Sequence, residues 1–182
     1  MKLLLKIAAA LLVVVVVFTV YGATLPVAHA AASMARFRQT PEALWATVSD
    51  FPGMTSWRRG VTSVERLPDR DGKPVWLVRD GSEAMPLMVV ESDPESWLKT
   101  VIPPDAGLPF GGSWSWQISP ADEATVVTII EQGEIYNPLF RALAQVVFGY
   151  HGTLNEALED LGRKFGEEVH PEPVPQAVVP AG

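Results

Sequence analysis

An apolar stretch near the start of the chain covers residues 7–23 (IAAALLVVVVVFTVYGA) and is interrupted only by Thr19. Extended to residues 3–25, it is long enough to cross the roughly 30 Å hydrocarbon core of a bilayer as a helix, with Lys6 reaching the interface. Ala28-His29-Ala30 follows and fits a signal-peptide cleavage site. Residues 1–28 are therefore predicted to be a membrane anchor or a signal segment. The length favours the anchor, because signal peptides carry only about 7–15 apolar residues.

Basic residues beside this segment predict its orientation. Lys2 and Lys6 precede the apolar stretch, and the positive-inside rule keeps them in the cytoplasm. The rest of the chain is then expected on the exported side of the cell membrane, periplasmic or extracellular, behind a single pass. Arg36 and Arg38 on the other flank act against this orientation. The alternative is a secreted protein that is cleaved after Ala30.

After the apolar stretch, short runs of alternating hydrophobicity predict β-strands. Thr40-Pro41-Glu42 has the N-cap, the N1 proline and the early acid of a helix start, and Phe51-Pro52-Gly53 ends that short helix. Residues 31–38 before the helix and six runs after it have strand-like composition. Turn residues separate the runs, which predicts an antiparallel meander. The six runs are residues 61–67, 73–79, 84–91, 97–102, 113–119 and 125–130, the last continuing to Glu134.

The hydrophobic period then changes to that of a helix. Asn137-Pro138 is a helix start, and most apolar residues of 139–165, though not Phe148, fall on one stripe at 100° per residue. We expect one helix of about 28 residues, near 40 Å long. It should pack on the sheet, which offers the apolar surface that such a helix needs. Gly149 and Gly152 inside it predict either a bend or close approach of a ligand, or close packing of the helix backbone on the sheet.

Charge and composition exclude several kinds of protein. The net charge is −7, and all 21 acidic residues follow residue 38, which argues against a nucleic-acid partner. The lack of cysteine excludes a disulfide scaffold, a thiolate metal site and a cysteine nucleophile. Three scattered histidines predict no metal site, and no cofactor motif occurs. We expect a globular domain over residues 29–166 and a Pro-rich disordered tail over residues 167–182.

The order of these elements and three segments of the sequence resemble a known superfamily. The segments are TPEALWATVSDFPGMTSWRRGVTSVERL, LPFGGSWSWQISP and EQGEIYNPLFRALAQVVFGYHGTLNEALEDLGRKF. They resemble the START-related SRPBCC superfamily, polyketide cyclase/dehydrase-like, in its membrane-anchored bacterial form. The resemblance covers about residues 31–166. It implies an α+β helix-grip fold, in which a curved antiparallel sheet wraps a long C-terminal helix and leaves a cavity for hydrophobic ligands.

Aromatic and aliphatic side chains are the candidates for lining such a cavity. Tryptophan suits cavity walls because it is large and its N–H needs a partner. The candidate ligand-binding residues are Trp76, Trp114, Trp116, Phe140, Leu143, Val147 and Tyr150. Arg58-Arg59 is either a phosphate-binding pair at the cavity mouth or an ordinary surface pair. His151 and Glu131 are the candidate acid–base residues, because no hydrolase elbow or phosphate-binding loop occurs.

Three functions fit these features. The first is a membrane-anchored module that binds a hydrophobic small molecule or lipid. The second is a cyclase/dehydrase-like or hydrolase-like enzyme that uses one acid–base residue of the cavity. The third is an interaction or stress protein whose interior is filled by side chains. The first is favoured because the sequence offers only two candidate acid–base residues and no catalytic motif.

Overall fold

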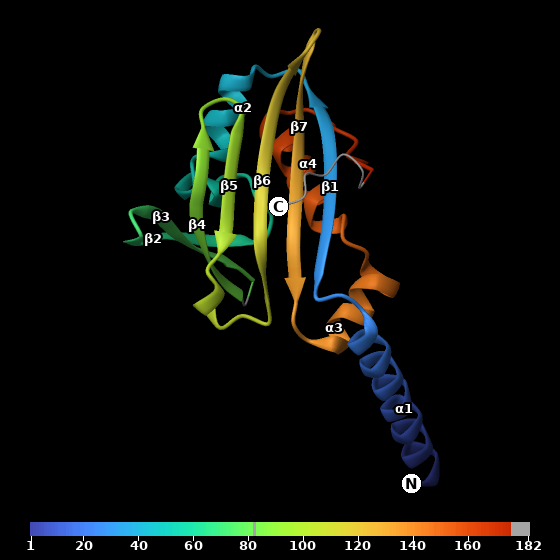
Figure 1. Cartoon of the computed structure of the whole chain (residues 1–182). Helices are drawn as coiled ribbons and strands as arrows, with labels where there is room; N and C mark the ends of the chain where they lie inside the picture. Colours follow the sequence, from blue (N-terminus) through green and yellow to red (C-terminus); the bar gives the residue numbers. More distant parts are fainter. Residues whose placement is uncertain (82, 176–182) are drawn as a thin grey trace.

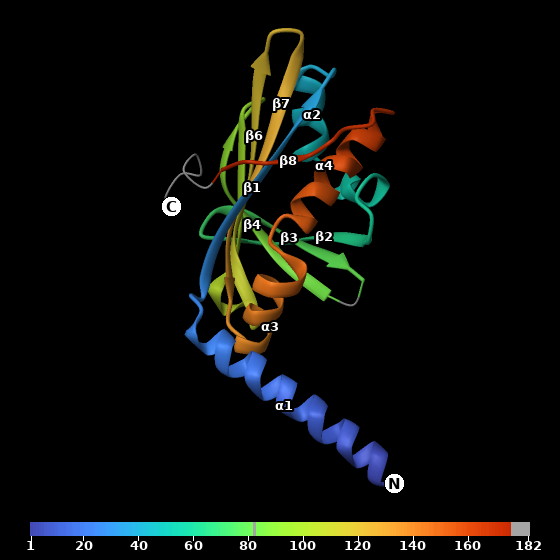
Figure 2. The same ribbon diagram turned by 90° about the vertical axis from the view of Figure 1, so that its right-hand side faces the viewer.

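The computed structural model describes residues 1–81 and 83–175. Its centre is a curved antiparallel sheet of eight strands in the order β2-β3-β4-β5-β6-β7-β1-β8. Helices lie on one face of the sheet, and one long helix projects away from one end (Figure 1, Figure 2). The strands are β1 (Ala28–Phe37), β2 (Val61–Arg70), β3 (Lys73–Asp80), β4 (Glu83–Asp93), β5 (Trp97–Ile102), β6 (Phe110–Ala121), β7 (Ala124–Ile135) and β8 (Glu172–Pro173).

The projecting helix is α1 (Lys2–Thr24), which coincides with the predicted apolar segment. It has 23 residues and a mean hydropathy of 2.9, and its apolar window is not buried by the rest of the chain. Within residues 1–81 and 83–175, it is the one helix long and apolar enough to cross a membrane. Length and composition alone support this reading, and the same test admits a signal sequence.

The first helix on the sheet begins as the sequence predicts. In α2 (Pro41–Val48), the Thr40 hydroxyl accepts a hydrogen bond from the backbone N–H of Ala43 at 3.4 Å. Leu44 and Val48 are buried against the sheet. A 3-10 turn, η1 (Pro52–Ser56), then carries the chain toward the first strand of the meander.

The six-strand meander and the first strand are confirmed, and the antiparallel α+β class with them. Most strands are longer than the sequence predicted, and β6 and β7 have 12 residues each. A 3-10 turn, η2 (Pro104–Ala106), interrupts the loop between β5 and β6.

The predicted closing helix is wrong in one respect: it is not continuous. The segment forms α3 (Pro138–Leu143), a π-helical turn η3 (Ala144–Phe148) and α4 (Gly152–Lys164). Gly149 separates them with φ +70° and ψ −176°, a conformation that is nearly restricted to glycine. A methyl group on Gly149 or Gly152 would meet open space, so these glycines serve the bend and not a close approach to the sheet.

Within this closing segment, α4 makes the main contact with the sheet. Its Leu154, Leu158 and Leu161 are completely buried together with Phe37 and Ile129 of the sheet. Helix α3 instead packs against α1, at the end of the domain where the long helix departs (Figure 1). Apolar residues continue at helical spacing on both sides of Gly149, and this explains why the periodicity predicts one helix.

The predicted disordered tail differs from the structure over residues 167–175. Val169 is buried in the core, and β8 pairs with β1 through Ser33 and Met34. The backbone N–H of Val174 also donates to the carbonyl of Ala32 at 2.8 Å. The rest of the predicted tail, residues 176–182, lies outside the described residues.

Candidate functional site

A cavity of about 520 Å³ lies between the concave face of the sheet and the segment that joins α2 to β2. Strands β3 to β7 supply most of its wall, and Thr153 at the start of α4 adds one side. Its apolar lining includes Val48, Phe51, Met54, Met85, Leu87, Leu98, Trp114 and Trp116. Its polar lining includes Arg58, Asp80, Glu83, Thr100, Ser113 and Glu131.

Strand alternation brings two tryptophans to this wall. Trp114 and Trp116 on β6 point to the same face because successive side chains alternate. Their rings meet edge to face with centroids 6.3 Å apart, and Trp57 packs on Trp116 in the same manner at 6.3 Å. Trp116 is 5% exposed and belongs to the core, whereas Trp114 is only partly buried.

A carboxylate stands beside Trp114 on the neighbouring strand. Trp114 and Glu131 are directly paired across β6 and β7, and the indole N–H donates to the Glu131 carboxylate at 2.9 Å. The other oxygen of Glu131 lies 3.0 Å from Nε2 of His29. The His29 ring stacks on Tyr150, with centroids 4.2 Å apart. Both carboxylate oxygens therefore have partners within the protein.

A buried cation covers the other side of Trp114. The Arg58 guanidinium lies 5.9 Å from the ring centroid, and its side chain is 11% exposed. Burial lowers the pKa of Arg58, and the carboxylate of Asp160 at 3.7 Å opposes this shift. One terminal nitrogen of Arg58 is buried without a hydrogen-bond partner among residues 1–81 and 83–175. The guanidinium thus helps to close the cavity wall at the cost of an incomplete hydrogen-bond set.

Asp160 of α4 is the centre of the charge cluster behind Arg58. It is completely buried and accepts bonds from the backbone N–H of Arg59 at 2.8 Å and from its Nε at 2.6 Å. Arg163 approaches the same carboxylate at 2.8 Å. The sequence left Arg58 and Arg59 as a surface pair or a phosphate-binding pair. In the structure Arg58 lies on the cavity wall, whereas Arg59 binds the carboxylates of Asp160 and Glu159 on α4.

Four of the sequence-predicted residues lie on the cavity wall, namely Arg58, Trp114, Trp116 and Glu131. Trp76 lies outside it and stacks on Phe51, with centroids 5.5 Å apart. His151 also lies outside it, and its Nδ1 is 3.1 Å from the buried hydroxyl of Ser33.

The structure does not place Phe140, Leu143 and Val147 on the cavity wall, because the break at Gly149 lets α3 pack mainly against α1. Phe140 is 51% exposed and Val147 is 59% exposed. Leu143 and Tyr150 are partly buried but do not line the cavity. Sequence reasoning missed Met85, Leu87 and Thr100, whose signal was the same strand alternation that identified the tryptophans.

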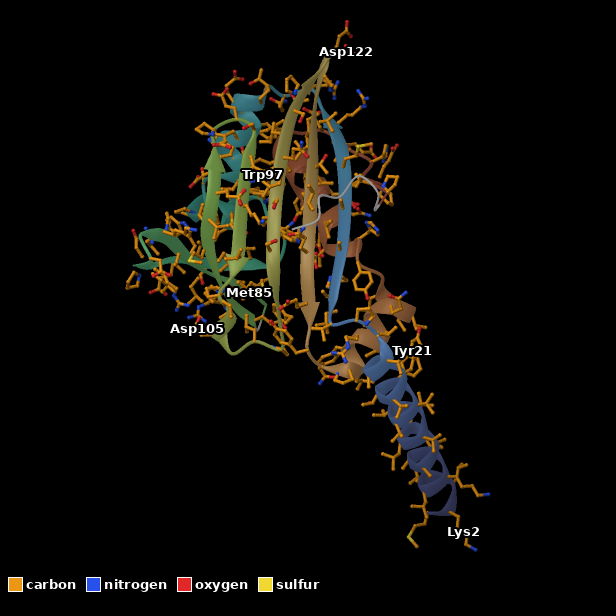
Figure 3. The ribbon with its side chains drawn as sticks, in the orientation of Figure 1. Lys2, Tyr21, Met85, Trp97, Asp105 and Asp122 are labelled. Atoms are coloured by element: carbon orange, nitrogen blue, oxygen red, sulfur yellow. The ribbon has the colours of Figure 1, made fainter. Side chains whose placement is uncertain are left out.

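One end of the cavity lies at the same end of the sheet as the start of β1, which follows α1. Gly111 pairs with Glu134 across β6 and β7, and Glu134 pairs with Ala28, the first residue of β1. Gly112 and Gly133, both on the cavity wall, form the next rung. Figure 3 accordingly places Met85 toward the end of the sheet from which α1 departs. No cluster of three or more metal-ligating side chains occurs in the described part of the chain.

Comparisons with known proteins agree with this architecture. The START superfamily protein from Mycobacterium smegmatis superposes with a TM-score of 0.57 at 16% identity, covering 75% of this chain and 96% of that one. The ZhuI aromatase/cyclase from Streptomyces sp. R1128 gives 0.57 at 14% identity, covering 75% and 93%. These likenesses confirm the helix-grip fold.

The sequence comparison assigns the family. No curated protein matches the chain. The family described as polyketide cyclase/dehydrase and lipid transport matches residues 29–166. The match covers most of the chain, from the second residue of β1 to just past the end of α4. The chain belongs to this family, and it has the fold of the solved START superfamily protein.

Proposed function

We propose that this protein is a membrane-anchored module that binds a hydrophobic small molecule or lipid in the cavity beneath the sheet. The cavity itself carries the proposal. Its volume of about 520 Å³ is within the range of about 300–1,000 Å³ that is usual for small-molecule sites. Its wall is mainly apolar, with Arg58, Thr100 and Glu131 as isolated polar points that can orient a ligand.

The position of the cavity supports a ligand that comes from a membrane. Helix α1 is 23 residues long, enough at 1.5 Å per residue to span a core of roughly 30 Å. With Lys2 and Lys6 in the cytoplasm, the domain lies on the exported side. The end of the cavity at Gly111 and Gly112 then faces the bilayer, since it shares its rungs with the start of β1.

The folded structure favours an anchor that is kept. Cleavage after Ala30 would remove the first three residues of β1, which pair with β7. It would also remove His29, and with it the bond to Glu131 and the stacking on Tyr150. The secreted form is the alternative, and the intact mass of the purified protein distinguishes the two.

Ligand binding is tested with the full chain extracted from membranes and examined by native mass spectrometry. We expect a stoichiometric apolar adduct, which extraction then identifies. Met85→Trp places a large ring in the cavity and should abolish the adduct. Met88→Trp is the matched control, because residue 88 lies on the opposite face of β4 and should keep it. A folded wild-type protein that takes up nothing from a lipid extract would contradict the proposal.

A cyclase/dehydrase-like enzyme is the second candidate, and Glu131 on the cavity wall is the observation that favours it. ZhuI, a structural neighbour, is an aromatase/cyclase. Glu131→Gln should then keep the adduct and stop its turnover. Because Trp114 and His29 already engage both oxygens of Glu131, we favour binding without catalysis. A substrate converted by the wild type and left intact by Glu131→Gln would reverse this order.

A further inference from the structure

The segment formed by α3 and η3 presents an apolar surface that the rest of the domain does not cover. Its exposed apolar side chains are Phe140 at 51%, Val146 at 58%, Val147 at 59% and Phe148 at 72%. Exposed clusters of this kind on a soluble protein mark a place where another apolar body binds. We name these four residues the α3–η3 patch.

Residues 138–148, which contain the patch, expose no charged side chain. Arg141 is the only charged residue between Pro138 and Phe148, and it is 7% exposed. Its guanidinium points into the protein, where it donates to the carbonyls of Gly22, Ile135 and Tyr136 at 2.9–3.0 Å. The segment therefore hides its cation and exposes its apolar side chains, which is the reverse of an ordinary surface helix.

The patch is continuous with the proposed membrane anchor. Arg141 binds the Gly22 carbonyl in the last turn of α1, and a methyl group on Gly22 would stand 1.7 Å from the Pro138 carbonyl oxygen. Helix α3 therefore touches the backbone of α1 itself. Figures 1 and 2 show α3 lying across the domain end of α1, and Figure 3 shows Tyr21 at this junction.

We infer that the α3–η3 patch lies in the interfacial layer of the bilayer, on the side where the domain stands, as a second contact with lipid. The inference rests on the proposed anchoring by α1. If α1 spans the membrane, its last turn is at the interface, and a segment packed across that turn is at the same depth. Phe140, Val146, Val147 and Phe148 then enter the boundary between headgroups and acyl chains, as in interfacial amphipathic helices.

This second contact fixes how the domain stands on the membrane. A single spanning helix leaves a domain free to rotate and tilt, whereas a second lipid contact beside it restricts both motions. The restricted orientation keeps the cavity end at Gly111 and Gly112 toward the bilayer. The device also explains why the closing helix is broken: a continuous helix on the sheet would turn these apolar residues away from the membrane.

Spin labelling of the full chain tests the inference, because the protein has no cysteine of its own. Single variants Val147→Cys, Val14→Cys and Asp122→Cys are labelled with a nitroxide and reconstituted in phosphatidylcholine vesicles. Collision with oxygen and with a water-soluble nickel chelate reports depth. Val14 lies in the middle of α1 and Asp122 at the far end of the domain (Figure 3). We expect a lipid signature at positions 147 and 14 and an aqueous one at 122.

Each other outcome overturns the inference and shows why. An aqueous label at 147 with a lipid label at 14 would refute the patch and leave the anchor intact. Aqueous labels at both would refute the anchoring as well. Dipolar broadening at 147 without a lipid signature would mean that a second copy covers the patch.

A double variant tests the patch residues themselves. Phe140→Ser combined with Phe148→Ser should shift the label at position 147 toward water. Met34→Ser, which changes an exposed apolar residue on β1, should leave that label in lipid.

Discussion

The indole of Trp114 donates a hydrogen bond to the carboxylate of Glu131, its direct partner across β6 and β7, at 2.9 Å. The second oxygen of Glu131 faces Nε2 of His29 at 3.0 Å, so three neighbouring strands meet at one carboxylate. This arrangement fixes the Trp114 ring against the cavity. A ligand that enters the cavity meets a wall whose aromatic face is already oriented.

Removal of this carboxylate should loosen the sheet. Glu131→Ala loses two hydrogen bonds, each with a net contribution of about 0.5–1.5 kcal/mol, so we expect a loss of about 1–3 kcal/mol in the free energy of unfolding. Glu134→Ala is the control on the same strand, since its exposed carboxylate accepts a single hydrogen bond within the described residues, from the Tyr136 hydroxyl. It should cost less than about 1 kcal/mol. Denaturant unfolding of the full chain in detergent measures both, and equal losses would contradict the role of Glu131.

Stability should depend strongly on Asp160, the buried carboxylate of the charge cluster behind the cavity. Asp160→Asn leaves the buried Arg58 guanidinium without its nearest counter-charge, a change that typically costs about 3–5 kcal/mol. Glu159→Gln removes an exposed partner of Arg59 on the same helix and should cost at most about 1 kcal/mol. The melting temperatures of the two variants compare them directly. A stable Asp160→Asn protein would show that Arg58 is hydrated through the cavity.

The break in the closing helix gives a pair of opposite predictions. Gly149→Ala forces a side chain into φ +70° and ψ −176°, which costs about 1–3 kcal/mol. Gly152→Ala, at the start of α4, has open space and no positive φ, so it should stabilise by about 0.4–1 kcal/mol. Thermal unfolding of the two variants tests the contrast. Stabilisation by Gly149→Ala would mean that the helix can close up across the break.

Alkaline titration should reveal the raised pKa of Tyr136. Its phenol donates to Glu134 at 2.8 Å, and this hydrogen bond is the main reason that the pKa of Tyr136 is raised. The contribution to stability is present below the ordinary tyrosine value of about 10 and is lost as the pH rises through the raised folded pKa.

Glu134→Gln should bring the pKa of Tyr136 down toward its ordinary value. Tyrosinate absorbance follows the change readily, because the chain has only three tyrosines. Tyr150, whose pKa is raised mainly by burial, should keep its titration and serves as the internal control. An unchanged absorbance curve in Glu134→Gln would show that the hydrogen bond is not formed in solution.

The sequence by itself determined the elements that local patterns control. The apolar length of α1, the Thr40-Pro41 start of α2 and the alternation of β6 follow from residue types a few positions apart, and the structure confirms them. Alternation also placed Trp114 and Trp116 on one face, because side chains on a strand have a strict period of two.

Gly149 and Gly152 indicated a possible bend, but tertiary structure alone decided what each half of the closing segment covers. The apolar stripe continues through Gly149, so periodicity could not show that α3 packs mainly against α1 and that α4 makes the main contact with the sheet. Likewise, Arg58 and Arg59 are neighbours in sequence, yet Asp160, about a hundred residues away, holds them in different surroundings. Contacts between distant segments fixed both results, and such contacts leave no local signal in the chain.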